Sequence, residues 1–220
     1  MSYLPCVEVE PAAAANAAVI WLHGLGADGH DFEPVVPHLG LSPGIAVRFV
    51  FPHAPSIAVT INNGYVMPAW YDILEMNLER KVDETQLRAS VRAVAALARR
   101  EQERGIPAAR IIIAGFSQGG AVGYELALTY PERLAGLIAL SSYFATQNSI
   151  APLATNAGLP ILICHGTRDP LIAEVFGQAS ARRLRELGYA VDYRTYPIEH
   201  SVSLDEIKDI GAWISARLGA

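Results

Sequence analysis

Short apolar runs alternate along the chain with longer segments in which apolar residues recur every three or four positions. The apolar runs indicate buried strands at residues 18–22, 45–51, 111–113, 137–140 and 160–164, and residues 3–10 and 189–196 also read as strands. The helical spacing predicts helices over residues 29–40, 83–105 and 173–187, after residue 117 and from residue 203. This alternation predicts an α/β fold with a mostly parallel sheet, helices on both faces, and ligands beyond the carboxyl ends of the strands.

Polar residues mark two of the predicted helix starts. Asp83 is followed three positions later by Gln86, and Ser203 is followed by Glu206 at the spacing of a capping box. Both helices should therefore begin directly after the first residue of each pair.

Residues 56–80 depart from the alternation because they show no clear period. They nevertheless carry large apolar side chains, namely Tyr65, Met67, Trp70, Tyr71, Ile73, Leu74 and Met76. A segment of this length without regular structure is usually functional or disordered. Its aromatic content speaks against disorder, so we expect a loop excursion that covers the active site.

Length and composition favour one domain over residues 1–220, because 220 residues with 51% hydrophobic content suit one large core. The net charge of −5 and the absence of a basic run argue against binding to nucleic acid. The N-terminus resembles neither a signal peptide nor a membrane anchor, so we expect a cytoplasmic protein without stable membrane insertion. Cys6 and Cys164 could form a disulfide or half of a metal site, but free buried thiols are the preferred interpretation.

The segment Gly115-Phe116-Ser117-Gln118-Gly119 matches the pattern of a nucleophile elbow, a sharp turn between a buried strand and a helix. The five-residue pattern alone is weak, because Gly and Ser occur in many turns. Its context strengthens it: three isoleucines precede it, and a helical pattern follows it. The N-terminus of that helix would direct unpaired N–H groups toward the serine. We therefore take Ser117 as the candidate nucleophile.

A serine nucleophile needs a base and an orienting acid, which follow it along the chain in an elbow-type sheet. His165 and His200 both follow predicted strands, and Asp169 lies beyond the end of the strand that precedes it. We assign Asp169 as the acid and His200 as the base. The simpler alternatives are a turn residue before Pro170 and a surface loop histidine.

Two other acids compete with Asp169. Glu199 is adjacent to His200 and would hardly reach its Nδ1, whereas Asp192 lies within an alternating strand and suits a solvated face. The oxyanion hole needs two N–H donors, for which we choose the backbone of Gln118 and of Leu25 in the loop after the first buried strand.

Neither a metal site nor a nucleotide site is favoured. Cys164 and His165 are adjacent on a strand, so their side chains point to opposite faces. Gly24, Gly26 and Gly29 give only a weak outline of a dinucleotide fingerprint, without a suitable acidic residue after the following strand. We therefore expect no metal and no cofactor.

Taken together, six segments resemble the carboxylesterase and acyl-protein thioesterase family of the α/β-hydrolase fold, most closely its small bacterial carboxylesterases. They are His23-Gly24-Leu25-Gly26, Pro52-His53-Ala54-Pro55, Met67-Pro68-Ala69-Trp70-Tyr71-Asp72, Gly115-Phe116-Ser117-Gln118-Gly119-Gly120-Ala121, His165-Gly166-Thr167-Arg168-Asp169 and His200. The resemblance implies hydrolysis of carboxylic esters and thioesters through an acyl-serine intermediate, without a cofactor and without a large cap domain. The chain departs from many members of the family at Ala27, where they carry an acidic residue.

The resemblance also implies roles for individual residues. The triad falls on Ser117, Asp169 and His200, and the oxyanion donors fall on Leu25 and Gln118. The acyl-binding surface falls on Met67 and Trp70, with Leu171 and Ile172 as further candidates; each could also be an ordinary core residue. The expected partners are a small ester or thioester, or an acylated protein, and a homodimer is plausible.

Three alternatives stay open at this point. A serine peptidase would use the same triad, although nothing in the sequence indicates a polypeptide pocket. A dienelactone-hydrolase-like enzyme would typically carry cysteine at the elbow, where this chain has Ser117. A binding protein on the same fold would carry out no chemistry at this serine.

Overall fold

A seven-stranded sheet forms the centre of the computed structural model, which describes residues 3–75 and 81–219. Its strands lie in the order β1-β3-β2-β6-β7-β8-β9. Their bounds are β1 Cys6–Val9, β2 Ala17–Leu22, β3 Val47–Pro52, β6 Ile111–Phe116, β7 Gly136–Leu140, β8 Ile161–Gly166 and β9 Val191–Tyr196. Only β1 at one edge is antiparallel to its neighbour, so the other six strands end at the same edge of the sheet.

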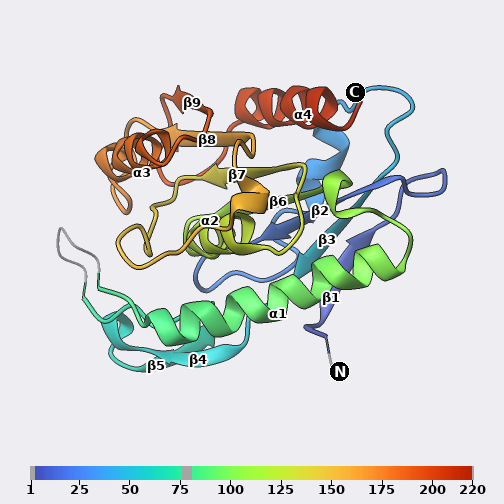
Figure 1. Cartoon of the computed structure of the whole chain (residues 1–220). Coiled ribbons are helices and arrows are strands. Elements are labelled where there is room, and N and C mark those ends of the chain that lie inside the picture. The colour runs from blue at the N-terminus through green and yellow to red at the C-terminus, as the bar shows by residue number, and fades with distance from the viewer. Residues whose placement is uncertain (1–2, 76–80, 220) are drawn as a thin grey trace.

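Helices cover both faces of the sheet, as the sequence predicts (Figure 1). They are α1 Glu84–Glu103, α2 Gln118–Thr129, α3 Glu174–Glu186 and α4 Leu204–Leu218, with short 3-10 helices at Glu33–His38, Thr60–Asn62, Ala108–Arg110 and Ala154–Asn156. The α1, α2 and α3 helices share one apolar cluster with Ile20 of β2, whereas α4 shares the opposite cluster with Trp21. Neighbouring residues of one strand thus serve two cores, because side chains alternate across a sheet.

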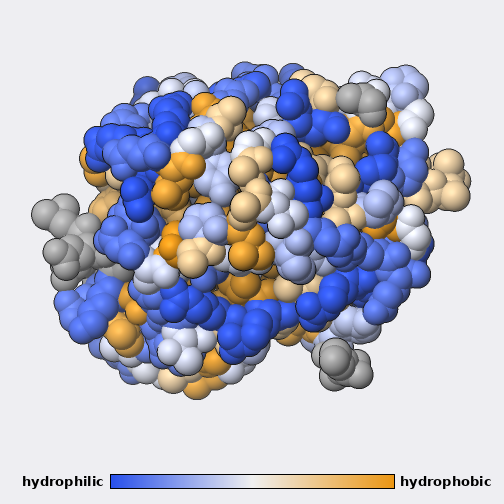
Figure 2. All heavy atoms as spheres, viewed as in Figure 1, coloured by the Kyte–Doolittle hydropathy of each residue, from blue (hydrophilic) through white to orange (hydrophobic). Residues whose placement is uncertain are grey.

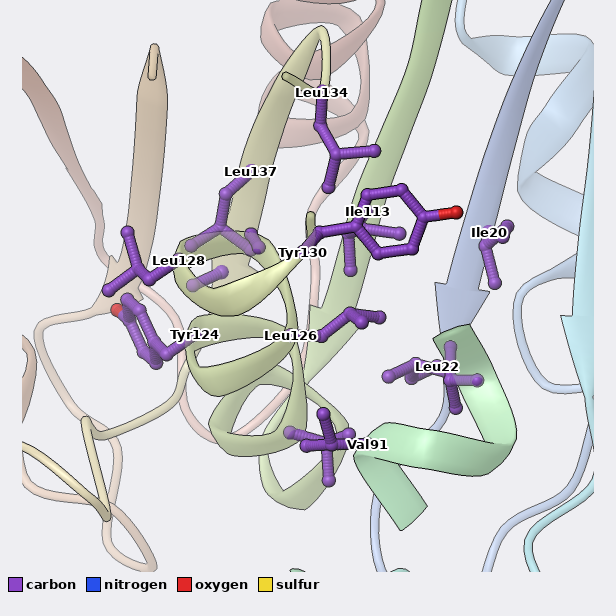
Figure 3. Close-up of a cluster of buried hydrophobic side chains, with 14 of the residues drawn as sticks. Ile20, Leu22, Val91, Ile113, Tyr124, Leu126, Leu128, Tyr130, Leu134 and Leu137 are labelled. Carbon is purple, nitrogen blue, oxygen red and sulfur yellow. The ribbon is translucent and has the colours of Figure 1, made fainter. Parts of the chain in front are cut away.

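The larger core joins α1 and α2 to the sheet (Figure 3). Leu126 of α2 and Val91 of α1 point toward Ile20 and Leu22 of β2, and all four side chains belong to the same buried cluster. Fully burying such a side chain contributes about 1.5–3 kcal/mol. This packing fixes the N-terminus of α2 relative to the end of β2, where the candidate nucleophile and oxyanion loop meet.

Both predicted helix starts are confirmed. The Asp83 side chain accepts a hydrogen bond from the Gln86 N–H, and Ser203 and Glu206 form both bonds of a capping box. The helix predicted over residues 29–40 is only a 3-10 helix at Glu33–His38, because Pro37 inside it has no N–H to continue an α-helix.

The prediction of an irregular excursion over residues 56–80 is wrong in its first half. Ser56–Val59 and Tyr65–Pro68 form an antiparallel hairpin, β4 and β5, which lies beside the start of α1 (Figure 1). Strands of four residues are too short to show a clear period in the sequence. Residues 76–80 of the predicted excursion lie outside the described residues.

The hairpin contacts the candidate oxyanion loop through the backbone. The N–H of Gly26 donates a 2.8 Å hydrogen bond to the carbonyl of Pro68, the last residue of β5. Part of the segment that we expected to cover the site therefore lies directly beside it.

The outer side of α1 is polar, and hydrophilic side chains dominate the lower part of the face in Figure 2, where α1 runs. Two of the larger exposed apolar side chains, Tyr65 and Val66, lie on the hairpin instead. None of the helices within residues 3–75 and 81–219 has both the length and the apolar character needed to cross a bilayer.

Candidate active site

Ser117 occupies the turn between β6 and α2 with φ 54° and ψ −117°, a conformation that is unfavourable for a residue with a side chain. The turn is tight enough to exclude side chains on both sides of it. A Cβ on Gly115 would clash with backbone atoms of Gly119, and a Cβ on Gly119 would meet the carbonyl oxygen of His23 at 2.5 Å. The two glycines of the elbow pattern are therefore required by the local packing.

The three predicted catalytic side chains lie in one hydrogen-bonded row. His200 Nε2 lies 3.0 Å from Ser117 Oγ, and His200 Nδ1 lies 2.6 Å from Asp169 Oδ2. Ser117 follows β6, Asp169 follows β8 and His200 follows β9, so the common edge of the sheet brings them together. The Phe116 ring packs against the imidazole of His200 with centroids 4.7 Å apart, which limits the orientations open to that ring.

The Asp169 carboxylate is buried but well partnered. Its Oδ1 accepts hydrogen bonds from the backbone N–H groups of Leu171 and Ile172 at 2.9 and 2.8 Å. Burial alone would raise the pKa of this carboxyl, but the bond to His200 and the two backbone donors hold the pKa below its ordinary value. Asp169 is therefore ionised at neutral pH and can accept the Nδ1–H of His200.

The alternative residues for the acid and base lie elsewhere. The His165 ring is fully buried, and its Nε2 bonds to the carbonyl of Ile172 at 2.8 Å. Asp192 pairs with Arg194 of the same strand, and Glu199 is exposed. Of the candidate acids, Asp169 is the one that contacts His200.

The two residues chosen to supply backbone donors for the oxyanion hole, Leu25 and Gln118, line the same cavity as Ser117. Among the described residues, neither the Leu25 N–H nor the Gln118 N–H has a hydrogen-bond partner. The Gln118 side chain is buried and holds the next segment, since its Oε1 accepts the Trp70 N–H and its Nε2 donates to the Tyr71 carbonyl. Both N–H groups are thus left without a partner among the described residues.

A cavity of about 320 Å³ opens at Ser117 and His200. Its other lining residues are mostly apolar, namely Gly24, Leu25, Ala27, Asp31, Ile61, Asn62, Ile73, Phe116, Gln118, Tyr143, Leu171 and Ile172. Leu171 and Ile172, two of the predicted substrate contacts, are among the residues that line this cavity. A wall of this kind suits an apolar acyl chain next to the reacting carbonyl.

Trp70 and Met67 do not line this cavity. The Trp70 side chain is only 1% exposed, and its indole N–H donates to the His23 carbonyl at 2.9 Å. Met67 is half-buried, and its sulfur accepts a hydrogen bond from the Asn62 amide. Both residues therefore support the loops around the cavity, and the structure gives neither a place in its wall.

Sequence reasoning did not single out several residues of the cavity wall, including Ile61, Ile73 and Tyr143. Ile61 and Ile73 lie in the segment that shows no period, so no pattern separates them from other apolar residues. Tyr143 lies three residues after β7, on the strand edge that carries the site. Its place directly after a buried strand is the one signal that could have identified it.

Comparison with known proteins places the chain in a family. Residues 5–218 match the family model described as phospholipase/carboxylesterase. Acyl-protein thioesterase 1 of Neurospora crassa is 39% identical over 225 residues, which cover 97% of this chain and 92% of that protein.

Solved structures agree with this match. Arabidopsis thaliana SOBER1 is 33% identical with a TM-score of 0.85, covering 93% of this chain and 100% of that chain. Acyl-protein thioesterase 2 of Zea mays is 27% identical with a TM-score of 0.84, covering 99% of this chain and 100% of that chain. The expected α/β-hydrolase fold is therefore confirmed. The chain belongs to the phospholipase/carboxylesterase family and is a hydrolase of the serine-hydrolase superfamily.

Proposed function

We propose that the protein hydrolyses carboxylic esters and acyl thioesters through an acyl-serine intermediate on Ser117. The observation that carries this proposal is the continuous row of hydrogen bonds from Ser117 through His200 to Asp169, at the wall of an apolar cavity. A serine hydroxyl is a weak nucleophile until a base takes its proton, and this row supplies both the base and the group that orients it.

The reaction begins when His200 Nε2 takes the Ser117 proton as Oγ attacks the acyl carbonyl. Asp169 accepts the Nδ1–H of His200, which fixes the tautomer and stabilises the imidazolium that forms. The Leu25 and Gln118 N–H groups bind the oxyanion of the tetrahedral intermediate. Each donor contributes about 3 kcal/mol by analogy with other oxyanion holes.

The second half of the reaction releases the acid. His200 returns the proton to the leaving alcohol or thiol, and water enters and is deprotonated by the same imidazole. The hydroxide equivalent attacks the acyl-serine carbonyl, and the carboxylic acid leaves as Ser117 regains its proton. No step of this cycle requires a cofactor.

The acyl group would lie against the apolar wall that includes Ile61, Ile73 and Ile172. Each buried methylene adds about 0.8 kcal/mol of binding energy until the wall is filled. Two relatives are named acyl-protein thioesterases, which favours a thioester of a protein-bound acyl chain as the natural substrate. A cytoplasmic location agrees with such a substrate and stays a prediction.

Kinetics with p-nitrophenyl esters of graded acyl length and with a long-chain acyl thioester test the proposal. Ser117→Ala should lower kcat by about 10⁴-fold to 10⁶-fold, because loss of the nucleophile leaves only binding and the oxyanion hole. Ser149→Ala is the matched control, since Ser149 is exposed and bonds to Arg88 and Glu84. If Ser117→Ala keeps the parent rate, or if Ser117 cannot be acylated, the protein does not work in this way.

The same assays separate the other candidate activities. Cleavage of peptides but not of aryl esters would indicate a peptidase, and cleavage of neither, without covalent labelling of Ser117, would indicate a binding protein. The predicted homodimer is tested independently by sedimentation at micromolar concentration. A single species of 23.7 kDa would contradict it.

A further inference from the structure

The His23 side chain is buried at the end of β2, directly before the loop that carries the oxyanion donor Leu25. Both of its ring nitrogens have partners. Nδ1 lies 2.7 Å from the carbonyl oxygen of Gly24, and Nε2 lies 3.1 Å from the backbone nitrogen of Ala54. The mechanism described above does not use this histidine.

The partners of His23 determine its tautomer. The Ala54 backbone N–H can only donate, so Nε2 must accept and cannot carry a proton. The Gly24 carbonyl can only accept, so Nδ1 must carry the proton. Burial also lowers the pKa of His23, and the neutral ring is therefore the form present at neutral pH.

The bond from His23 to the Gly24 carbonyl fixes the direction of the Leu25 N–H. Gly24 C=O and Leu25 N–H belong to the same peptide unit, which is planar, and in a trans unit the two groups point in opposite directions. Holding the carbonyl toward the buried imidazole therefore turns the N–H away from it. Leu25 lies on the cavity wall beside Ser117, where that N–H meets the developing oxyanion.

A second donor reaches the same carbonyl, but at a longer distance. The Ala27 N–H lies 3.3 Å from the Gly24 oxygen, compared with 2.7 Å for His23 Nδ1. The imidazole is itself held in place, because its own backbone carbonyl accepts the Trp70 indole N–H and its ring packs against that of Trp70. The short bond thus comes from a ring with little freedom to move.

We propose that His23 is a positioning residue for the oxyanion hole, which aims the Leu25 N–H through its Nδ1–H bond to Gly24. The inference rests on the proposed function, because it gives His23 a role only if Leu25 binds an oxyanion. It predicts that the Nδ1 bond controls the rate of the chemical step. The Nε2 bond to Ala54 stabilises the fold and affects the rate much less.

Two substitutions separate the two bonds. In His23→Asn the side-chain amide occupies the place of Nδ1 and can still donate to the Gly24 carbonyl, but nothing reaches the Ala54 N–H. In His23→Gln the amide extends to the place of Nε2 and can accept from Ala54, but nothing donates to Gly24. Each variant keeps one bond and loses the other. His23→Asn should lose more thermal stability, because it leaves the Ala54 N–H without a partner, whereas in His23→Gln the Gly24 carbonyl still accepts from the Ala27 N–H.

The expected kinetic result is a difference in kcat. Removal of an oxyanion donor costs about 10²-fold to 10³-fold, and a misdirected donor should lose part of that, so His23→Gln should lower kcat on the order of 10-fold to 100-fold. His23→Asn should stay within about threefold of the parent, and KM should change little in both. Equal losses of kcat in the two variants, or a loss confined to KM, would overturn the proposal.

A measurement on the unmodified protein covers the case in which neither variant folds. Nitrogen NMR of the His23 ring at pH 7 should show a protonated Nδ1 and an unprotonated Nε2; the opposite tautomer or a charged ring would also overturn the proposal. The Ser117→Ala assay keeps the two proposals separate. If Ser117→Ala is inactive while His23→Asn and His23→Gln have equal kcat, the proposed function stands and only the positioning role of His23 fails.

Discussion

His23 and His165 occupy corresponding places in the fold but are held differently. His23 directly follows β2, and His165 is the last residue but one of β8. Each is followed by a glycine, and each is at most 1% exposed. Each also bonds to a backbone carbonyl in the loop after its strand, at Gly24 and at Ile172. His23 uses Nδ1 for this bond and has a partner for Nε2, whereas His165 uses Nε2, and no described residue partners its Nδ1.

In the proposed reaction, the two loops present different kinds of group. The loop after β2 offers a backbone N–H, so only the orientation of a peptide unit can adjust it. The loop after β8 offers the Asp169 carboxylate, whose Oδ1 is held by two backbone N–H groups, one of them from Ile172. A bond from His165 to the Ile172 carbonyl therefore steadies the same residue that orients Asp169.

The largest expected effect is a loss of kcat when the Asp169 carboxylate is replaced. Asp169→Asn should lower kcat by about 10⁴-fold, by analogy with other Ser-His-Asp enzymes, because an amide favours the wrong tautomer of His200. Steady-state kinetics on an aryl ester measures it, with Asp192→Asn as the control, since Asp192 pairs with Arg194 away from the cavity.

A loss of less than tenfold in Asp169→Asn would remove the contrast between the two loops. It would mean that His200 is oriented mainly by the packing of Phe116 against its ring.

The sequence predicts the catalytic side chains, Asp169 and His200, better than it predicts the orientation of the Leu25 backbone N–H. Asp169 and His200 follow strands in the required order, and their residue types are those that the chemistry needs. In the proposed mechanism, the direction of the Leu25 N–H depends on the ring of His23, which packs against Trp70, 45 positions further along the chain than Leu25. No local pattern encodes such a contact between distant positions. The sequence therefore does not show that Trp70 packs against His23, and we expected it to line the substrate pocket.

The sequence also predicts some elements of the fold better than others. Apolar runs and the capping box of Ser203 and Glu206 identify β2 and α4 with nearly correct bounds, and they identify the start of β6 but not its end. The β4–β5 hairpin was missed because each strand has four residues and a 3-10 turn at Thr60–Asn62 separates them. Asn63 adopts φ 55° there, a conformation that asparagine tolerates, but the pair Asn63-Gly64 alone gives only a weak turn signal.

Substitutions of His165 should have a moderate effect on stability and kcat. Here Gln should be tolerated better than Asn, whereas at His23 Asn should be better for activity. His165→Gln can place an amide N–H where Nε2 was and keep the bond to Ile172, whereas His165→Asn leaves that buried carbonyl without this donor. An unsatisfied buried group costs about 1–3 kcal/mol, so His165→Asn should unfold at lower urea concentration than His165→Gln. It should also have the lower kcat, because the Asp169 loop loses its anchor.

Activity and urea unfolding of the two His165 variants should be measured beside the Asn and Gln variants of His23. We expect Gln to be the better replacement at residue 165 and Asn the better replacement for activity at residue 23. The same preference at both positions would show that these histidines fill space and do not act through particular ring nitrogens.

The smallest expected effect is on the pH dependence of stability. Burial lowers the pKa of both histidines below 6.5, so in the folded state they stay neutral at a pH where the unfolded chain already binds protons. Their neutral forms therefore stabilise the fold above about pH 6.5, and this contribution falls as the pH drops toward the lowered values. The slope is at most about 1.4 kcal/mol per pH unit for each histidine.

This slope is measured by thermal unfolding between pH 7.5 and pH 5, in steps of about 0.5 pH unit. A proton on Nε2 of His23 would break the bond from Ala54, whereas a proton on Nδ1 of His165 would break no bond to a described residue. His23→Asn should therefore flatten the acid side of the profile more than His165→Gln does. A larger flattening in His165→Gln would mean that close packing of Gly177 against Nδ1 of His165 opposes protonation more strongly than the lost bond does at His23.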